Sequence, residues 1–562
     1  MSLPNSAFAP LDFAGWRALD PLDRARRPGT SGPGDPAWIL SPAQFTVREG
    51  EEGGPLTGLA FAVKDNIDVA GVPTTAGCPE FAYTPTRDAP VVRRLLGAGA
   101  RLVGKTNMDQ FATGLVGTRS PFGIVPNVHN PAYICGGSSS GSASAVARGL
   151  VPIALGTDTA GSGRVPAGLN GIVGLKPTRG WVSAWGVVPA CRSLDCMSIL
   201  TARVRDASLV ASVLGGFDPD DPYARLRPPV DVFHLPTRRL AVPAMLPWFE
   251  DDLQAQAWEE ALARWRALGY QLMPVDPEPL FSMAALLYEG PWVAERIVGI
   301  RGFYPAQADK IHPVIRTILD GAAKFDAASV FRAEDKRREL ARTIAGLWEG
   351  CDALLVPTVP TVYTIQEVLA DPLRTNARLG TWTNFVNLAD LCALAVPAGR
   401  RADGLPFGVT LIGRAWEDVR LAALGEEWEG WSDEVEVAVL GAHLSGLPLN
   451  PLLTRRGARL VGPARTAARY RLYAIEDQSP PKPGLVRVAQ GGGAVAVEIW
   501  ALPRAAYGAF VAEVRPPLGI GTLELDDGRR VQGFLCESWA TDGRRDITEW
   551  GGWKAWLASG AQ

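Results

Sequence analysis

Two glycine- and serine-rich segments and one lysine are the residues of this sequence best suited to catalysis. Ser138 lies in the run Gly-Gly-Ser-Ser-Ser-Gly-Ser at 136–142, and Ser162 lies in Gly-Thr-Asp-Thr-Ala-Gly-Ser-Gly-Arg at 156–164. Lys64 directly follows the apolar run Leu-Ala-Phe-Ala-Val. Small residues let a backbone approach a bound carbonyl group closely. Two hydroxyls beside such a backbone, together with a base, predict nucleophilic attack on a carbonyl carbon.

The base in this set is expected to be the lysine. A lysine in water keeps its proton up to a pKa of about 10.4, so Lys64 can accept a proton only if burial favours its neutral form. Its position after five apolar residues fits that requirement. None of the four histidines lies in a recognisable motif, which disfavours a Ser-His-Asp mechanism.

The lysine and the two serines together resemble the amidase signature family. Members of that family cleave amides with a lysine, a serine preceded by a cis peptide bond, and a second serine that attacks. The family order is kept here, and the 24 residues from Ser138 to Ser162 match the family spacing. The resemblance implies that neutral Lys64 takes the proton of Ser138, that Ser138 takes the proton of Ser162, and that Ser162 attacks the amide carbonyl.

The same resemblance implies an oxyanion hole on the second glycine-rich run. Its donors are the backbone N–H groups of Thr159, Ala160, Gly161 and Ser162. Losing one such donor typically raises the barrier by about 2.7 to 4 kcal/mol. Three charged neighbours are expected to brace the loops and not to react: Asp158, Arg164 and Asp109.

Several positions point to one branch of the family. Ser140 and Ala160 stand where glycine is usual, and Gly163 replaces an aliphatic residue. These departures resemble the allophanate hydrolase subgroup, as does the segment 286–296, which carries Tyr288 and Arg296 at substrate-contacting positions. Allophanate is a small carboxylate with a terminal amide, and a guanidinium offers a carboxylate two parallel donors. Without the resemblance, two residues eight apart fit an ordinary stripe on a helix surface better.

Apolar runs alternate with helical patterns over most of the chain. Strands are expected at 59–63, 101–104, 151–155, 240–242, 353–356 and 407–412, and helices at 89–96, 142–148 and 252–268. This alternation predicts an α/β fold, in which a large domain has a mixed central sheet covered by helices.

The alternation of strands and helices gives way to short strands after about residue 446. We expect an amidase signature domain at 1–446, an irregular linker at 447–465, and a smaller, mostly β (α+β) domain at 466–562. The last domain resembles the one appended to allophanate hydrolases. In that subgroup the first domain releases ammonia from allophanate to give N-carboxycarbamate, and the second acts on this unstable product. Glu537 and Asp546 are candidates for the second step, with a structural or dimerising role for this domain as an equal alternative.

The composition and net charge of the chain limit the partners that the protein is expected to bind. The chain has 562 residues and a net charge of −3, which gives no electrostatic reason to bind nucleic acid or an anionic membrane. It shows neither a signal-like start nor an uninterrupted apolar stretch of about 18 residues, so a cytoplasmic location is expected. The seven cysteines are scattered without metal-ligand spacing and are expected to be free buried thiols; no cofactor or metal is expected. The family resemblance implies a homodimer and a separate urea carboxylase that supplies allophanate.

Two other functions remain open at this point. A broad-specificity amidase, or a glutamine-dependent amidotransferase-type subunit, would share the relay but have a different pocket. A non-catalytic scaffold, with the second domain as its binding module, is opposed by the presence of Lys64, Ser138 and Ser162 together.

Overall fold

The protein is described by a computed structural model that covers residues 9–32, 34–228, 237–300, 302–430, 434–477 and 480–560. The chain divides into two compact units, Met1–Glu429 and Gly430–Gln562. Within the ranges described, no helix has the length and apolar character needed to cross a bilayer.

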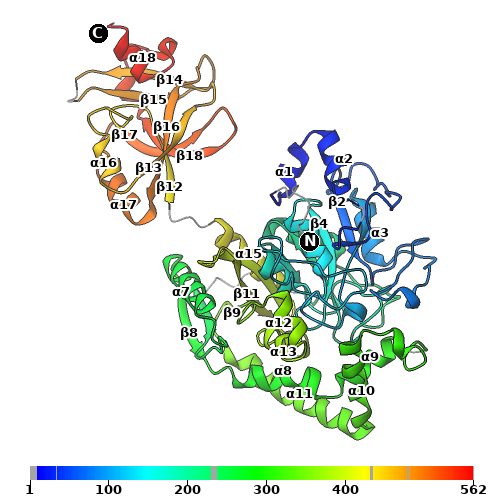
Figure 1. The fold of residues 1–562 in the computed structure, drawn as a ribbon. Helices are drawn as coiled ribbons and strands as arrows, with labels where there is room; N and C mark the ends of the chain where they lie inside the picture. Colours follow the sequence, from blue (N-terminus) through cyan, green and yellow to red (C-terminus); the bar gives the residue numbers. More distant parts are fainter. Residues whose placement is uncertain are drawn as a thin grey trace. The chain divides into compact units, whose positions relative to one another are not determined.

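The larger unit is built on an 11-stranded mixed sheet (Figure 1). In spatial order its strands are β1 (Trp38–Leu40), β3 (Arg101–Thr106), β2 (Ala60–Lys64), β4 (Ile153–Asp158), β6 (Cys196–Thr201), β5 (Val173–Lys176), β10 (Leu391–Arg400), β11 (Pro406–Arg414), β9 (Ala353–Pro357), β7 (Arg239–Pro243) and β8 (Gln271–Val275). Strand β2 pairs in parallel with β3 and β4, whereas β10 pairs antiparallel with β5 and β11. The predicted α/β class with a mixed sheet is confirmed.

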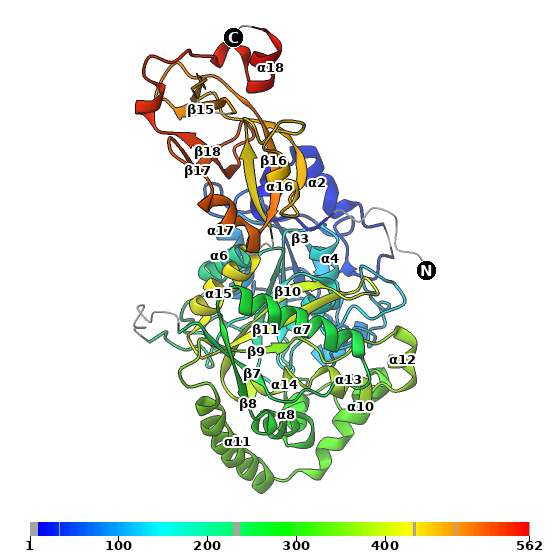
Figure 2. The same cartoon turned by 90° about the vertical axis from the view of Figure 1, so that its left-hand side faces the viewer.

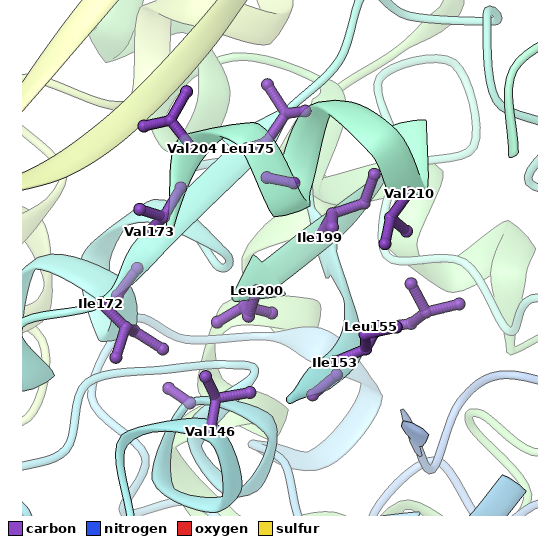
Figure 3. Close-up of a cluster of buried hydrophobic side chains, with 14 of the residues drawn as sticks. Val146, Ile153, Leu155, Ile172, Val173, Leu175, Ile199, Leu200, Val204 and Val210 are labelled. Carbon is purple, nitrogen blue, oxygen red and sulfur yellow. The ribbon is translucent and has the colours of Figure 1, made fainter. Parts of the chain in front are cut away.

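Helices cover the central strands. Strands β2, β4, β5 and β6 are buried at every position, as expected for a sheet covered on both faces. Figure 3 shows part of this core, in which side chains of β4, β5 and β6 meet Val146 of α4 (Ser140–Ala147) and Val204 and Val210 of α6 (Val204–Leu214). Helices α3 (Pro90–Gly97), α5 (Arg164–Asn170) and α7 (Asp252–Ala267) also contact strands of the sheet. The unit further contains α1 (Phe13–Ala18), α2 (Pro21–Gly29), α15 (Asp418–Gly430) and α12 (Ile365–Ala370), of which α12 contacts α13 (Arg374–Leu379).

A second group of helices gathers at one end of this unit (Figures 1 and 2). Its members are α8 (Glu278–Glu289), α9 (Trp292–Gly299), α10 (Pro313–Asp320), α11 (Ala327–Leu347), α13 (Arg374–Leu379) and α14 (Asn384–Leu388). Helix α8 ends at Gly290, and Pro291 caps α9. Because proline cannot donate the next helical hydrogen bond, the chain breaks there and Tyr288 and Arg296 lie on different helices.

The smaller unit is mostly β, as predicted. A five-stranded sheet has the order β13 (Arg459–Arg465), β16 (Ala496–Pro503), β12 (Glu434–Val439), β18 (Arg530–Cys536) and β17 (Leu518–Glu524), and β14 (Tyr470–Ile475) pairs with β15 (Lys482–Arg487). Its helices are α16 (Pro451–Thr454), α17 (Arg504–Ala512) and α18 (Trp553–Ala558). Trp553 and Trp556 pack in its core with ring centroids 4.7 Å apart.

This unit begins earlier than the expected boundary at 446. Strand β12 pairs with β16 and β18 of the same unit. The stretch 447–465, expected to be a linker, holds α16 and the strand β13, which pairs with β16. The prolines of this stretch favoured the prediction of a linker. Pro451 is instead the first residue of a short helix, a position that proline favours.

Candidate active site

Lys64, the last residue of β2, lies at the centre of a buried polar cluster. Its side chain is 0% exposed, and its Nζ donates to Ser138 Oγ at 2.7 Å and to Thr157 Oγ1 at 2.7 Å. Thr157 lies on the neighbouring strand β4, and Ser138 precedes α4. The peptide bond between Gly137 and Ser138 is cis. The structure therefore brings two of the three expected residues into direct contact and adds Thr157, which the sequence analysis missed.

The surroundings of Lys64 favour its neutral form. Burial lowers the pKa of Lys64 to about 7, although the negative charges of Asp109, Asp195 and Asp158 oppose the shift. Its two hydrogen-bond partners are hydroxyls, and neither carries a charge that would hold the proton on the amine. Near neutral pH a large fraction of Lys64 is thus free to accept a proton.

Gly137 is required by close packing around the first serine. A Cβ at this position would lie 2.3 Å from Asp109 Oδ2 and 2.7 Å from the Gly117 nitrogen. Asp109 in turn accepts hydrogen bonds from the backbone N–H groups of Gly117 (3.0 Å) and Arg119 (2.9 Å). The Asp109 N–H donates to the Ser138 carbonyl oxygen at 3.2 Å, so Asp109 connects the loop at Gly117 and Arg119 to the segment that carries Ser138.

Ser162 lies beside the first serine run. The Ser139 N–H donates to the Ser162 carbonyl oxygen at 3.2 Å, which joins the two glycine-rich segments. The Ser162 hydroxyl donates to the Gly114 carbonyl oxygen at 3.4 Å. Proton transfer from Ser162 to Ser138 therefore requires the Ser162 hydroxyl hydrogen to turn away from the Gly114 carbonyl oxygen.

Asp158 organises the loop before Ser162. Its carboxylate forms a fully buried ion pair with Arg164 at 2.8 Å and accepts the N–H groups of Gly161 (2.9 Å) and Gly163 (3.2 Å). The Gly161 N–H is thus already committed to Asp158, so it is not available to a substrate oxyanion as the sequence analysis expected. The hydrogen bonds of the described residues leave three of the four expected donors without a protein acceptor: Thr159, Ala160 and Ser162.

Asp195 is a further buried acid next to this loop. It accepts hydrogen bonds from the Thr159 hydroxyl and from the backbone N–H groups of Ala190 (2.9 Å) and Cys191 (3.2 Å). Burial raises the pKa of Asp195 to about 6. Asp195 holds the Thr159 side chain in place. No local motif marks Asp195, because its carboxyl and Thr159 are 36 residues apart in the chain.

Tyr288 and Arg296 face each other across the break between α8 and α9. Arg296 is 3% exposed as a residue. Its guanidinium lies 5.4 Å from the Tyr288 ring centroid and donates from Nη1 to Thr113 Oγ1 at 3.0 Å. Its Nε has no protein partner among the described residues. This burial overturns the alternative of a surface stripe. Tyr288 also lines a cavity of about 500 Å³.

The C-terminal unit has a cavity of its own. It has a volume of about 100 Å³, and His443, Lys482 and Arg515 are among its lining residues. The His443 ring stacks on Phe534 with centroids 5.0 Å apart. Burial lowers the pKa of His443 to about 4, and the charge of Lys482 adds to the shift. His443 was not among the expected residues because no local motif marks it.

The two acids expected to act in this unit lie elsewhere. Glu537 and Asp546 are both exposed, and neither lines the cavity. Asp546 accepts the backbone N–H of Thr548, two residues on, at 2.9 Å, as in an ordinary turn. Exposure and local hydrogen bonding mark both acids as surface residues.

The seven cysteines are free and buried, as expected. Within the described part of the chain, no group of three or more His, Cys, Asp or Glu side chains is arranged to hold a metal ion.

Comparison with known proteins shows to which family this chain belongs. A family model described as Amidase matches residues 41–422, and one described as Allophanate hydrolase C-terminal domain matches residues 435–558. The chain belongs to the amidase family. It is an amidohydrolase, an enzyme acting on the C–N bonds of amides.

Three relatives show how far the likeness extends. The urea amidolyase of Saccharomyces cerevisiae is 43% identical over 93% of this chain and 31% of its own length. A Kluyveromyces lactis allophanate hydrolase structure has 40% identity and a TM-score of 0.69, and covers 98% of this chain and 99% of that one. A glutamyl-tRNA(Gln) amidotransferase structure from Thermotoga maritima has 32% identity and a TM-score of 0.62, over 73% of this chain and 92% of that one.

These alignments differ in what they cover. The chain spans about a third of the length of the curated urea amidolyases that it matches. The match to the K. lactis allophanate hydrolase extends over both units, whereas curated glutamyl-tRNA(Gln) amidotransferases match about two thirds of the chain.

Proposed function

We propose that this protein is an allophanate hydrolase that releases ammonia from the terminal amide of allophanate. The observation that carries the proposal is the hydrogen bond from Lys64 Nζ to Ser138 Oγ at 2.7 Å, in a buried site with a buried arginine for a carboxylate. The end-to-end likeness to the K. lactis allophanate hydrolase supports this choice among amides.

The relay follows from the contacts. Neutral Lys64 takes the hydroxyl proton of Ser138 while Ser138 takes that of Ser162, and Ser162 Oγ bonds to the terminal amide carbon of allophanate. The proton returns through Ser138 to the leaving nitrogen, the C–N bond breaks, and ammonia departs. Water then cleaves the ester formed on Ser162 by the same relay, which gives N-carboxycarbamate and restores the serine.

The oxyanion is stabilised by fewer donors than the family resemblance implies. We assign this role to the N–H groups of Thr159, Ala160 and Ser162, since the Gly161 N–H donates to Asp158. Each preorganised donor is worth about 2.7 to 4 kcal/mol of barrier. Asp195 contributes by holding Thr159.

The carboxylate of allophanate is assigned to Arg296, with Tyr288 beside it. The unpartnered Nε of Arg296 is a buried donor that a carboxylate oxygen would satisfy. Because this contact is present in both the ground state and the transition state, Arg296→Ala should mainly raise KM for allophanate. An unchanged KM would remove Arg296 from the pocket.

The C-terminal unit is proposed to act on N-carboxycarbamate. Its cavity is lined by two cationic side chains, Lys482 and Arg515, by one acid, Glu513, and by His443, which burial keeps neutral. The two cations suit a product with two carboxylates. In the full chain, His443→Asn should delay carbon dioxide release relative to the first ammonia. Simultaneous release in both proteins would leave this unit a structural or dimerising role.

Substrate comparison tests the assignment. Initial rates of ammonia release should be highest with allophanate, lower with malonamate and negligible with glutamine, and Ser162→Ala should abolish all of them. Activity on glutamine or simple amides without activity on allophanate would favour the broad amidase or amidotransferase-type alternative. Labelling of Ser162 by a fluorophosphonate probe excludes a non-catalytic scaffold.

The remaining assignments rest on the family resemblance. They are a homodimer, a cytoplasmic location, and supply of allophanate by a urea carboxylase, for which the urea amidolyase names of the relatives are further support. Light scattering of the purified protein tests whether it is a homodimer.

A further inference from the structure

Arg119 is a buried cation that forms no ion pair within the described residues. It is 1% exposed, as deeply buried as Arg148 and Arg164. Those two arginines each contact a buried carboxylate: Arg148 contacts Asp35 at 2.7 Å, and Arg164 contacts Asp158 at 2.8 Å. Arginine is seldom fully buried without such a partner, because an unpaired charge is costly to take out of water. Arg119 is therefore an exception among the buried arginines, and its charge needs a reason.

Arg296 is a second buried arginine without an ion pair in the described part of the chain, and it meets Arg119 at one residue. Arg119 Nη1 donates to the Thr113 carbonyl oxygen at 3.0 Å, and Arg296 Nη1 donates to the Thr113 hydroxyl at 3.0 Å. Burial lowers the pKa of Arg119, and the positive charge of Arg296 adds to the shift, against the charge of Asp109. A guanidinium nevertheless keeps its proton in proteins. Two positive charges thus lie on either side of Thr113.

The residue after Thr113 connects this pair of arginines to the attacking serine. The carbonyl oxygen of Gly114 accepts the Ser162 hydroxyl at 3.4 Å, and a Cβ on Gly114 would lie 3.2 Å from Arg119 Nη1. The same Cβ would lie 2.7 Å from Asp109 Oδ2, but the Asp109 carboxylate accepts backbone N–H groups and forms no ion pair with the guanidinium in the structure described. The Arg119 side chain therefore packs against the residue that contacts the nucleophile.

We infer that Arg119 is a specificity-determining residue whose charge, added to that of Arg296, selects amides that carry a carboxylate. This inference rests on the proposed function, in which Arg296 binds the carboxylate of allophanate. Arg119 does not have to touch the substrate, because charges in a buried site interact over several ångströms far more strongly than in water. An anionic substrate supplies the counter-charge that neither arginine finds in the protein, whereas a neutral amide does not.

The test compares two reactions of Ser162 in the full-length protein. Hydrolysis of allophanate takes up an anion, and labelling by an uncharged fluorophosphonate does not. The readout is kcat/KM for allophanate, counted per labelled serine, divided by the rate constant of labelling, so unfolded protein does not contribute. Arg119→Gln should lower this ratio about tenfold, mainly through KM, because one of two positive charges is lost. Arg119→Met, which loses the same charge but suits a buried position, should give the same result.

Two variants separate the charge from a structural role. Arg119→Lys keeps the charge but loses the planar guanidinium that donates to the carbonyl oxygens of Thr113 and Pro372, so it should keep most of the ratio. Arg94→Gln is the matched control. Arg94 lies on α3 and also donates to backbone carbonyl oxygens, those of Leu214 and Gly216, and loss of its charge should leave the ratio unchanged.

The outcomes distinguish this inference from the proposed function. An unchanged ratio in Arg119→Gln, or an equal drop in Arg119→Lys, overturns the role of the Arg119 charge and leaves the proposed function standing. No ammonia from allophanate with the unmodified protein would instead overturn the proposed function itself.

Discussion

Two buried lysines on neighbouring strands show what separates a structural cation from a base. Lys64 on β2 and Lys105 on β3 are both 0% exposed, and Val63 pairs with Lys105 in the parallel ladder. Lys105 Nζ lies 3.3 Å from Asp65 Oδ1 and donates to the Pro73 carbonyl oxygen and to Thr74 Oγ1. Lys64 Nζ donates to two hydroxyls.

The difference lies in the counter-ion. Burial lowers the pKa of both lysines, but at Lys105 the adjacent charge of Asp65 is the main opposing influence and makes a buried ion pair. At Lys64 the acids that oppose the shift make no ion pair with it in the described structure, and its pKa falls to about 7. Burial alone does not make a catalytic base; burial without a contacting carboxylate does.

Among changes at the two lysines and their partners, the largest effect on activity is expected from Lys64→Met. Without a base at this position, kcat/KM for allophanate should fall by about 10²- to 10⁴-fold, the range of general acid–base catalysis. The free energy of unfolding should stay the same or rise, because an amine that is costly to bury is replaced by an apolar side chain. Urea unfolding monitored beside the kinetics separates the two results, and a large loss of stability would contradict the comparison.

Lys105→Met should give the reverse pattern. It leaves Asp65 buried without its cation, which typically costs about 3 to 5 kcal/mol of folding free energy. Protein that remains folded should turn over at close to the normal rate per labelled Ser162. A stable but inactive variant would show that Lys105, too, takes part in the relay.

A smaller effect is expected from the hydroxyl partners of the two lysines. Thr157→Val removes one of the two acceptors that orient Lys64 and should lower kcat/KM about tenfold. The matched change at the other lysine, Thr74→Val, removes a hydroxyl acceptor from Lys105 and should leave kcat/KM within about twofold. Equal losses in the two variants would mean that the cluster around Lys64 has no special role.

Local patterns were sufficient to predict much of this arrangement. An apolar run that ends in Lys64 becomes the buried strand β2, and the alternation of strands and helices predicted the mixed sheet. The two glycine-rich runs hold the serines that were expected to react, and the hydrogen bond from the Ser139 N–H to the Ser162 carbonyl oxygen joins them. These features depend on the sequence within each segment and on the order of segments along the chain.

Features that depend on distant contacts could not be found in this way. Thr157 meets Lys64 across 93 residues, and Asn387 meets the Asp158 carbonyl oxygen across 229 residues. The sequence predicted that the Gly161 N–H is a free donor, whereas in the structure it donates to the Asp158 carboxylate. In the second unit, His443 carries no motif, and its burial against Phe534 is visible only in the fold.

The most direct test of the account is the pH dependence of fluorophosphonate labelling at Ser162, because this reaction needs the relay but no particular substrate. Only neutral Lys64 can start the relay, so protonation removes activity as the pH falls through the pKa of about 7. The labelling rate should therefore fall about tenfold per pH unit below that value and stay level above it. A rate that is independent of pH, or that keeps rising toward pH 10 and beyond, would contradict a neutral Lys64 as the base.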